Sequence, residues 1–155
     1  MQTLTEKQVN AYSPLALAFL GDSVYECMMR SRILGSANMP NAKLHNLTIR
    51  RVCAEYQSAA VDVILPMLTE QEQTVLHRGR NATGNTVPKH ADVQTYRRAT
   101  ALECLFGYLH LLGRQDRLEE LFEIADRVTV MRDGCFVDTK EIAEIDRKQL
   151  ISMMA

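Results

Sequence analysis

Acidic side chains interrupt two strongly apolar segments of this 155-residue chain. Asp22 follows the apolar run 15–20 and Gly21, and Glu103 lies among apolar and small residues of a second segment. A carboxylate that is buried alone is costly, so each acid must be protonated, paired with a cation or bound to a metal. Two buried helices that each carry one embedded acid favour carboxylates converging on a hard cation such as Mg²⁺.

Ion pairing is the alternative explanation for these acids. Glu26 lies one helical turn after Asp22, and the two like charges repel each other unless a cation is close. Arg30 is spaced to pair with Glu26, and an arginine elsewhere in the chain could pair with Glu103. Spacing alone therefore leaves a metal site and structural ion pairs both open.

Two predicted helices position the acids. The first covers residues 13–33, and its apolar residues 15–20 lie almost all round the helix, which predicts that it is buried. The second covers residues 92–112, carries Glu103, and is followed by Gly113, a residue suited to the end of a helix. The sequence thus predicts two packed helices that each contribute one carboxylate.

Further helices are expected between and after these two. Residues 42–57 and 58–65 form two of them, and a capping box at Thr69 and Glu72 begins a short helix that ends near Gly79. An apolar stripe at helical spacing predicts one more helix and consists of Leu118, Leu121, Phe122 and Ala125. The body of the chain is therefore expected to be all-α.

The charge pattern and overall composition restrict the class of protein. Residues 28–54 hold five basic side chains and no acid, and residues 77–98 hold five against only Asp92, although the net charge is −1. Such stretches favour a polyanion bound on one face, although solvated helix surfaces explain them equally well. Hydrophobic residues make up 46% of the chain, yet no apolar run is long enough to cross a bilayer. A cytoplasmic protein without membrane association is expected.

Several segments resemble one enzyme family. Residues 15–26, Leu-Ala-Leu-Ala-Phe-Leu-Gly-Asp-Ser-Val-Tyr-Glu, resemble the signature helix of ribonuclease III catalytic domains. The segments at 75–82, 86–89, 92–97 and 103–109 resemble, in the same order, the Mini-III branch, which lacks a separate domain for binding double-stranded RNA. The resemblance covers about residues 12–125.

The resemblance implies an all-α, ribonuclease III-like endonuclease fold that forms a homodimer and cleaves double-stranded RNA. It implies that Asp22 and Glu103 are catalytic and bind Mg²⁺, for which Mn²⁺ can substitute, with Glu26 as a candidate third ligand. The implied substrate is a precursor of 23S ribosomal RNA, cut to leave 5′-phosphate and 3′-hydroxyl ends. Full ribonuclease III has further acids where this chain has Leu15, Ala18 and Thr100, and their absence puts a complete second metal shell in doubt.

The polar segment 79–91 has no apolar periodicity, and long loops of this kind are often functional. It resembles the segment that contacts RNA in the family. The implied phosphate ligands are Arg78, Arg80 and Lys89, and the residues implied to reach groove edges or 2′-hydroxyls are Asn81, Thr83 and Asn85. In the alternative interpretation, Arg78 caps the preceding helix and Asn81 only closes a turn. Arg97 and Arg98 fit either a dimer contact or the wall of the catalytic valley.

The last thirty residues differ from the rest. Residues 127–131 alternate like a strand, Asp133-Gly134 is a hairpin turn signal, residues 136–137 can form the returning strand, and a short helix is expected from about Asp146. We therefore expect a catalytic domain over 1–125 and an appendage of β-hairpin and helix over 126–155. From about residue 120 the sequence resembles a late segment of sugar-import transporter ATPases. The chain has no phosphate-binding loop of the Gly-x-x-x-x-Gly-Lys type, so no nucleotide cofactor is expected.

Three functions are compatible with these patterns. An endoribonuclease specific for double-stranded RNA is the main hypothesis, because both Asp22 and Glu103 are present. A non-catalytic protein that binds structured RNA or the ribosome on the same fold is the alternative, because the acidic set is reduced. A transporter-associated protein is supported only by the tail.

Overall fold

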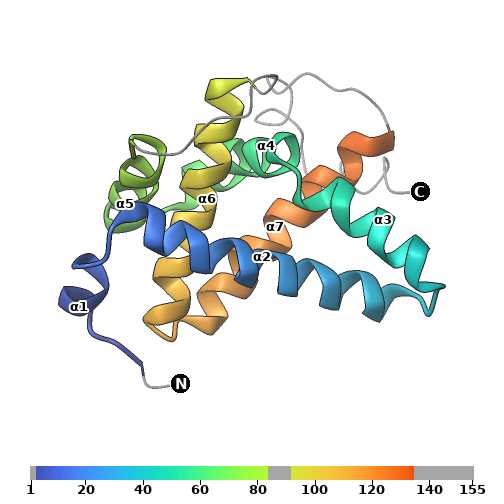
Figure 1. The fold of residues 1–155 in the computed structure, drawn as a ribbon, viewed down its shortest axis with the longest axis horizontal. Coiled ribbons are helices and arrows are strands. Elements are labelled where there is room, and N and C mark those ends of the chain that lie inside the picture. Colours follow the sequence, from blue (N-terminus) through green and yellow to red (C-terminus); the bar gives the residue numbers. More distant parts are fainter. Residues whose placement is uncertain (1–2, 84–91, 135–155) are drawn as a thin grey trace.

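The computed structural model describes residues 3–83 and 92–134, and these residues form a series of helices (Figure 1). These residues contain no strand, in agreement with the predicted all-α class. The elements in chain order are α1 (Glu6–Asn10), α2 (Pro14–Ser36), α3 (Asn41–Val52), α4 (Ala54–Ile64), the 3-10 helix η1 (Leu65–Met67), α5 (Glu70–Arg80), α6 (Val93–Leu111) and α7 (Gln115–Gly134).

Local signals in the sequence fix where these helices begin and end. The Ser13 hydroxyl accepts a hydrogen bond from the Ala16 amide, and the capping box at Thr69 begins α5 with both of its hydrogen bonds present. The Asp92 carboxylate accepts from the Thr95 amide in the same way. At the end of α6, Gly113 has a φ of +69°, a conformation that glycine adopts without strain. The predicted start of each of these helices is confirmed.

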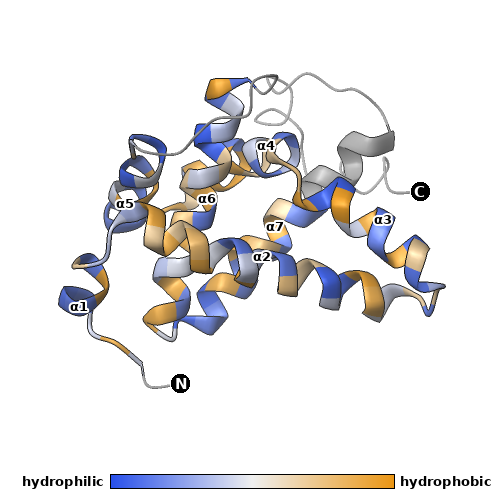
Figure 2. Ribbon diagram, viewed as in Figure 1, coloured by the Kyte–Doolittle hydropathy of each residue, from blue (hydrophilic) through white to orange (hydrophobic). Residues whose placement is uncertain are grey.

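The centre of the molecule is α6. Every residue from Ala99 to Leu109 is buried except Glu103, because α2, α4 and α5 all pack on this helix. Figure 2 shows hydrophobic residues along much of α6, whereas α5 is largely hydrophilic. Glu103 is therefore the one residue in the stretch from Ala99 to Leu109 that is not buried. Within the described ranges, no helix has the length and apolar character needed to cross a membrane.

The boundary between the two helices expected over 42–57 and 58–65 was placed wrongly. The break lies at Cys53, whose backbone is extended with φ −69° and ψ 158°, and α4 begins at Ala54. The helix thus starts four residues before the predicted position 58, and Tyr56 and Gln57 already lie on its buried side. Two apolar stripes that adjoin without glycine or proline give no local signal for the break.

The predicted β-hairpin at the C-terminus is also wrong. Residues 127–131 belong to α7, which runs unbroken from Gln115 to Gly134. Once a helix has formed on the buried stripe that includes Leu118 and Phe122, extending it adds one hydrogen bond per residue, whereas an isolated hairpin has no sheet to join. Residues 136–137 and the helix expected from Asp146 lie outside the described part of the chain, and the division at residue 125 stays a prediction.

Helix α2 is buried on one side only, contrary to the prediction that it is apolar and buried all round. Leu17 and Ala18 are in the core, whereas the Phe19 side chain is 82% exposed. Asp22 and Ser23, three and four residues later, share this outward side and are also exposed. The apolar run 15–20 therefore supplies both the side of α2 that faces the core and part of its exposed side.

Candidate catalytic and metal-binding site

Two glycines allow α2 and α6 to touch backbone to backbone. A Cβ atom on Gly21 would lie 1.7 Å from the carbonyl oxygen of Glu103, and one on Gly107 would lie 2.0 Å from the carbonyl oxygen of Leu17. No side chain fits at either position, so the helices cross closely only because both residues are glycine. The crossing places Asp22, the neighbour of Gly21, beside the turn of α6 that carries Glu103.

The carboxyl groups of Asp22 and Glu103 interact electrostatically at this crossing. Burial and, after it, the nearby Asp22 carboxylate raise the pKa of Glu103 to about 7, although the Gln57 side chain, as a hydrogen-bond donor, lowers it in part. Burial and the neighbouring Glu26 also raise the pKa of Asp22. An ionised acid at this site disfavours ionisation of the acid next to it. The site is therefore an electronegative centre that a cation would stabilise.

Glu26 differs from the other two acids because it already has a counter-ion. Arg30 donates from Nε and Nη2 to Oε1 of Glu26, at 2.8 and 2.5 Å, across one turn of α2. The ion pair proposed as the alternative for Glu26 is therefore present. No lysine or arginine in the described ranges forms an ion pair with Glu103, so the corresponding alternative fails for that residue.

The donor set fits a weakly chelated Mg²⁺ ion better than a closed metal cage. In the part of the chain that the structure describes, no three His, Cys, Asp or Glu side chains are grouped to hold a metal. Mg²⁺ is commonly bound through one or two carboxylates together with waters and substrate phosphate oxygens. Asp22 and Glu103 can supply such a pair, while Ala18 and Thr100, where full ribonuclease III has acids, are both buried and add no charge.

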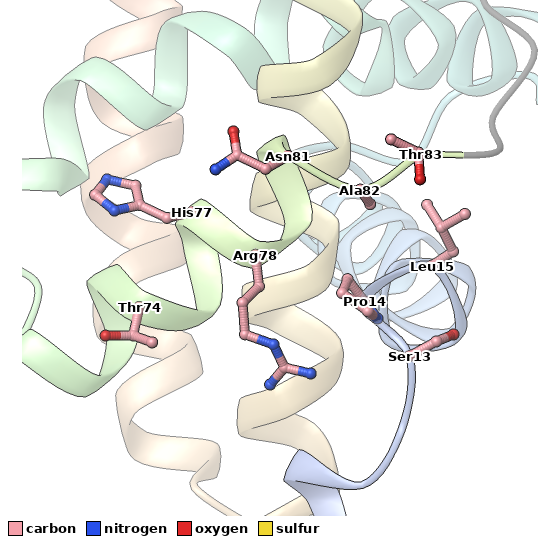
Figure 3. A pocket seen from close by; sticks show the side chains of 9 residues that line it. All are labelled: Ser13, Pro14, Leu15, Thr74, His77, Arg78, Asn81, Ala82 and Thr83. Carbon is pink, nitrogen blue, oxygen red and sulfur yellow. The ribbon is translucent and has the colours of Figure 1, made fainter.

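A surface cleft of about 610 Å³ lies between the start of α2 and the end of α5 (Figure 3). It brings together three of the predicted RNA-binding residues, Arg78, Asn81 and Thr83. Arg78 also holds the chain that leads into α2, because its guanidinium donates to Asn10 Oδ1 at 3.3 Å and to the Tyr12 carbonyl oxygen at 3.2 Å. A structural contact of Arg78 is therefore present, although to the α1–α2 connection and not to its own helix.

The remaining predicted RNA-binding residues are only partly described. Asn81 ends α5, and its amide donates to the His77 carbonyl oxygen, as expected for a residue that closes a turn. The exposed Arg80 side chain contacts Asn81 Oδ1 at 3.5 Å. Asn85 and Lys89 lie outside the described residues.

The sequence did not reveal the roles of two residues near the site, Gln57 and Arg98. Gln57 of α4 is 1% exposed and faces Glu103. Arg98, expected at a dimer contact or the valley wall, joins α6 to α4 by donating to the Ser58 carbonyl oxygen at 3.1 Å and pairing with Asp62. The only available signal for Gln57 was a polar residue at core spacing in an alanine-rich segment.

Comparison with known proteins gives consistent matches. The family model described as "Ribonuclease III domain" matches residues 15–114. A Mini-ribonuclease 3 of Thermoanaerobacter sp. is 42% identical over 127 residues, which is 82% of this chain and 89% of the relative. A Mini-ribonuclease 3 of Desulfitobacterium hafniense is 46% identical over 113 residues, covering 73% of this chain and 71% of the relative. A crystal structure of a Fusobacterium nucleatum protein superposes with a TM-score of 0.70 at 30% identity, covering 77% of this chain and 96% of that one.

Proposed function

Because this chain belongs to the ribonuclease III domain family and to its Mini-ribonuclease 3 members, we propose that it is an endoribonuclease that hydrolyses double-stranded RNA. The observation that carries the proposal is the meeting of Asp22 and Glu103 at the Gly21–Gly107 crossing, with no cation paired to Glu103 in the described chain. A largely buried acid such as Glu103 is normally paired with a cation, whereas here its charged neighbour is a second acid, Asp22.

The reaction follows from the placement of the two acids. Asp22 is exposed at the surface and can meet a phosphodiester, while Glu103 anchors the site from the core helix. Mg²⁺ held by these carboxylates would activate a water molecule and offset the charge that develops at the phosphate. Water oxygen bonds to phosphorus, the bond from phosphorus to the 3′ oxygen breaks, and that oxygen leaves with a proton. The products are a 5′-phosphate and a 3′-hydroxyl end. Mn²⁺ can replace Mg²⁺, and Glu26 can assist through the oxygen that Arg30 leaves free.

A homodimer suits this substrate, and Phe19 supports it. A phenylalanine that is 82% exposed beside a catalytic acid is best explained by cover from a second copy of the chain. In a two-fold dimer each subunit can address one strand of the duplex. The enzyme would then cut both strands within one bound duplex.

We further propose that the substrate is a precursor of 23S ribosomal RNA and that the protein acts in the cytoplasm, as the resemblance of its sequence to the Mini-III branch implies. The cleft at the end of α5 would contact the duplex. Arg78, Arg80 and Lys89 would bind phosphates, and Asn81, Thr83 and Asn85 would reach groove edges or 2′-hydroxyls.

Cleavage of a long RNA duplex tests the proposal. Wild-type protein with Mg²⁺ should cut the duplex, whereas Asp22→Asn and Glu103→Gln should bind it with similar affinity in Ca²⁺ and lose at least about a hundredfold in rate. A wild-type protein that binds the duplex but leaves it intact in both Mg²⁺ and Mn²⁺ would instead be a non-catalytic RNA-binding protein.

A further inference from the structure

Gln57 is an uncharged polar side chain in a place otherwise given to the core. It lies in the first turn of α4 and is 1% exposed, and the other buried residues of this helix are Tyr56, Ala60, Val61 and Ile64. Carboxamides are mostly found at protein surfaces, because burying their donors and acceptors without partners is unfavourable. A specific polar partner for Gln57 is therefore expected nearby.

The amide nitrogen of Gln57 has no hydrogen bond of ordinary geometry in this structure. The group that it faces is the Glu103 carboxyl, on which Gln57 acts as a hydrogen-bond donor and lowers the pKa. A buried donor without an acceptor is rare in native proteins and calls for an explanation. A fully ionised Glu103 carboxylate would provide the missing acceptor.

Contacts of α6 with α4 and with α2 fix the position of Gln57 relative to Glu103. Arg98, just over one turn before Glu103 on α6, donates to the carbonyl oxygen of Ser58, the residue after Gln57. On another side, the carbonyl of Glu103 packs against Gly21 of α2. The half-buried Glu103 carboxyl is thus influenced from two helices, by Asp22 of α2 and by Gln57 of α4.

We propose that Gln57 is a positioning residue that donates a hydrogen bond from Nε2 to one carboxylate oxygen of Glu103 and leaves the other oxygen directed at the metal shared with Asp22. The role rests on the proposed function, because it requires a divalent cation between the two acids. Outer hydrogen bonds of this kind fix the orientation of a ligand and typically change metal affinity by about 10–100-fold when they are removed. Gln57 touches neither substrate nor metal.

Binding of Mn²⁺, followed by electron paramagnetic resonance on the full chain without RNA, tests this role. Gln57→Met keeps the length and volume of the side chain but removes the donor, so Mn²⁺ should bind about 10–100-fold more weakly. The melting temperature of the metal-free protein should stay the same or rise, because a buried donor without a partner has been removed. The Michaelis constant for the RNA duplex should not change, while the Mn²⁺ concentration for half-maximal cleavage should rise.

Gln73 offers a matched control. Its Nε2 donates at 3.1 Å to the carbonyl oxygen of Leu68, just before α5, and Gln73 is not among the groups that shift the pKa of Asp22 or Glu103. Gln73→Met should lower the melting temperature and leave the affinity for Mn²⁺ at the wild-type value. Equal Mn²⁺ affinities for wild type and Gln57→Met would overturn the role of Gln57 alone. If Asp22→Asn and Glu103→Gln also bound Mn²⁺ with wild-type affinity, the proposed function would be overturned as well.

A second measurement needs no variant to fold. In the wild-type protein, the side-chain amide protons of Gln57 should shift in the nuclear magnetic resonance spectrum and exchange more slowly with water when Mg²⁺ is added. Amide signals that neither move nor become protected at saturating Mg²⁺ would contradict the proposal.

Discussion

The carboxyl groups of Asp22 and Glu103 lie close enough that the ionisation of one disfavours the ionisation of the other. Burial and the Asp22 carboxylate together raise the pKa of Glu103 to about 7 from its usual 4.5. A divalent cation bound between the two carboxyl groups would remove this repulsion. The unfavourable electrostatic energy of the metal-free site therefore contributes to its affinity for a divalent cation.

Removing the charge of Glu103 should stabilise the metal-free protein at high pH. The pKa of Glu103 is higher in the folded than in the unfolded chain, so the wild type loses stability as the pH rises from about 4.5 to about 7. This pKa difference corresponds to about 3 kcal/mol, of which screening by water leaves about 2. In EDTA at pH 8, Glu103→Gln should melt about 5 °C higher than wild type, with no difference at pH 4. Equal melting temperatures at pH 8 would contradict the cost of ionising Glu103 that burial and the Asp22 carboxylate impose.

The sequence was sufficient to find both acids but not what surrounds them. Asp22 and Glu103 stand out because they interrupt apolar segments, and the ion pair between Glu26 and Arg30 follows from a spacing of four. Gln57 could not be assigned to Glu103, because the two residues lie on different helices and only the packing of α4 on α6 brings them together. Contacts between helices of this kind have no local signature.

At the scale of the element, the site depends on the contact between α2 and α6. Gly21 and Gly107 let the two backbones approach to a distance that excludes any Cβ atom. Gly35, in the last turn of α2, has nothing within 4 Å of an added Cβ. One helix therefore contains both an essential glycine and a dispensable one.

Alanine at these glycines should have opposite effects. Gly21→Ala and Gly107→Ala force backbones apart and should each lower the free energy of unfolding by about 2–4 kcal/mol, measured by denaturant titration. Gly35→Ala, the matched control, should be neutral or stabilise the protein by up to about 1 kcal/mol, because alanine is the better helix former. A Gly21→Ala protein as stable as Gly35→Ala would show that the crossing is looser than the structure has it.

Helix starts were predictable where a side chain caps them, as at Ser13, Thr69 and Asp92. The break at Cys53 was not predictable, because no glycine, proline or capping side chain marks it, and the extent of α7 was not, because residues 127–134 also fit a strand followed by a hairpin turn. Alternating valine and threonine in residues 127–131 suit a strand as well as a helix, and the helix already begun at Gln115 decides between them.

At the scale of the whole molecule, one exposed side chain bears on the proposed homodimer. Phe19 lies on the outward side of α2, three residues before Asp22, and is the most exposed large hydrophobic residue in the described chain. Ile49 of α3 is also exposed, at 51%, but lies on another helix. The two residues allow a matched comparison.

Substitution of Phe19 should separate the subunits. The chain mass is 17.6 kDa, so a wild-type homodimer should measure about 35 kDa by light scattering. Phe19→Ser should raise the dimer dissociation constant at least about tenfold, because buried aromatic residues dominate interfaces. Ile49→Ser should leave the dimer intact. A dimer that resists Phe19→Ser but dissociates with Ile49→Ser would move the interface to α3.

A crystal structure of the protein grown with Mn²⁺ tests the central claim most directly. We expect one anomalous peak per subunit between the carboxyl groups of Asp22 and Glu103, with an oxygen of each about 2.1 Å from the ion. Manganese bound elsewhere, or carboxyl groups of Asp22 and Glu103 that turn away from one another, would contradict the shared metal site and the nuclease mechanism that depends on it.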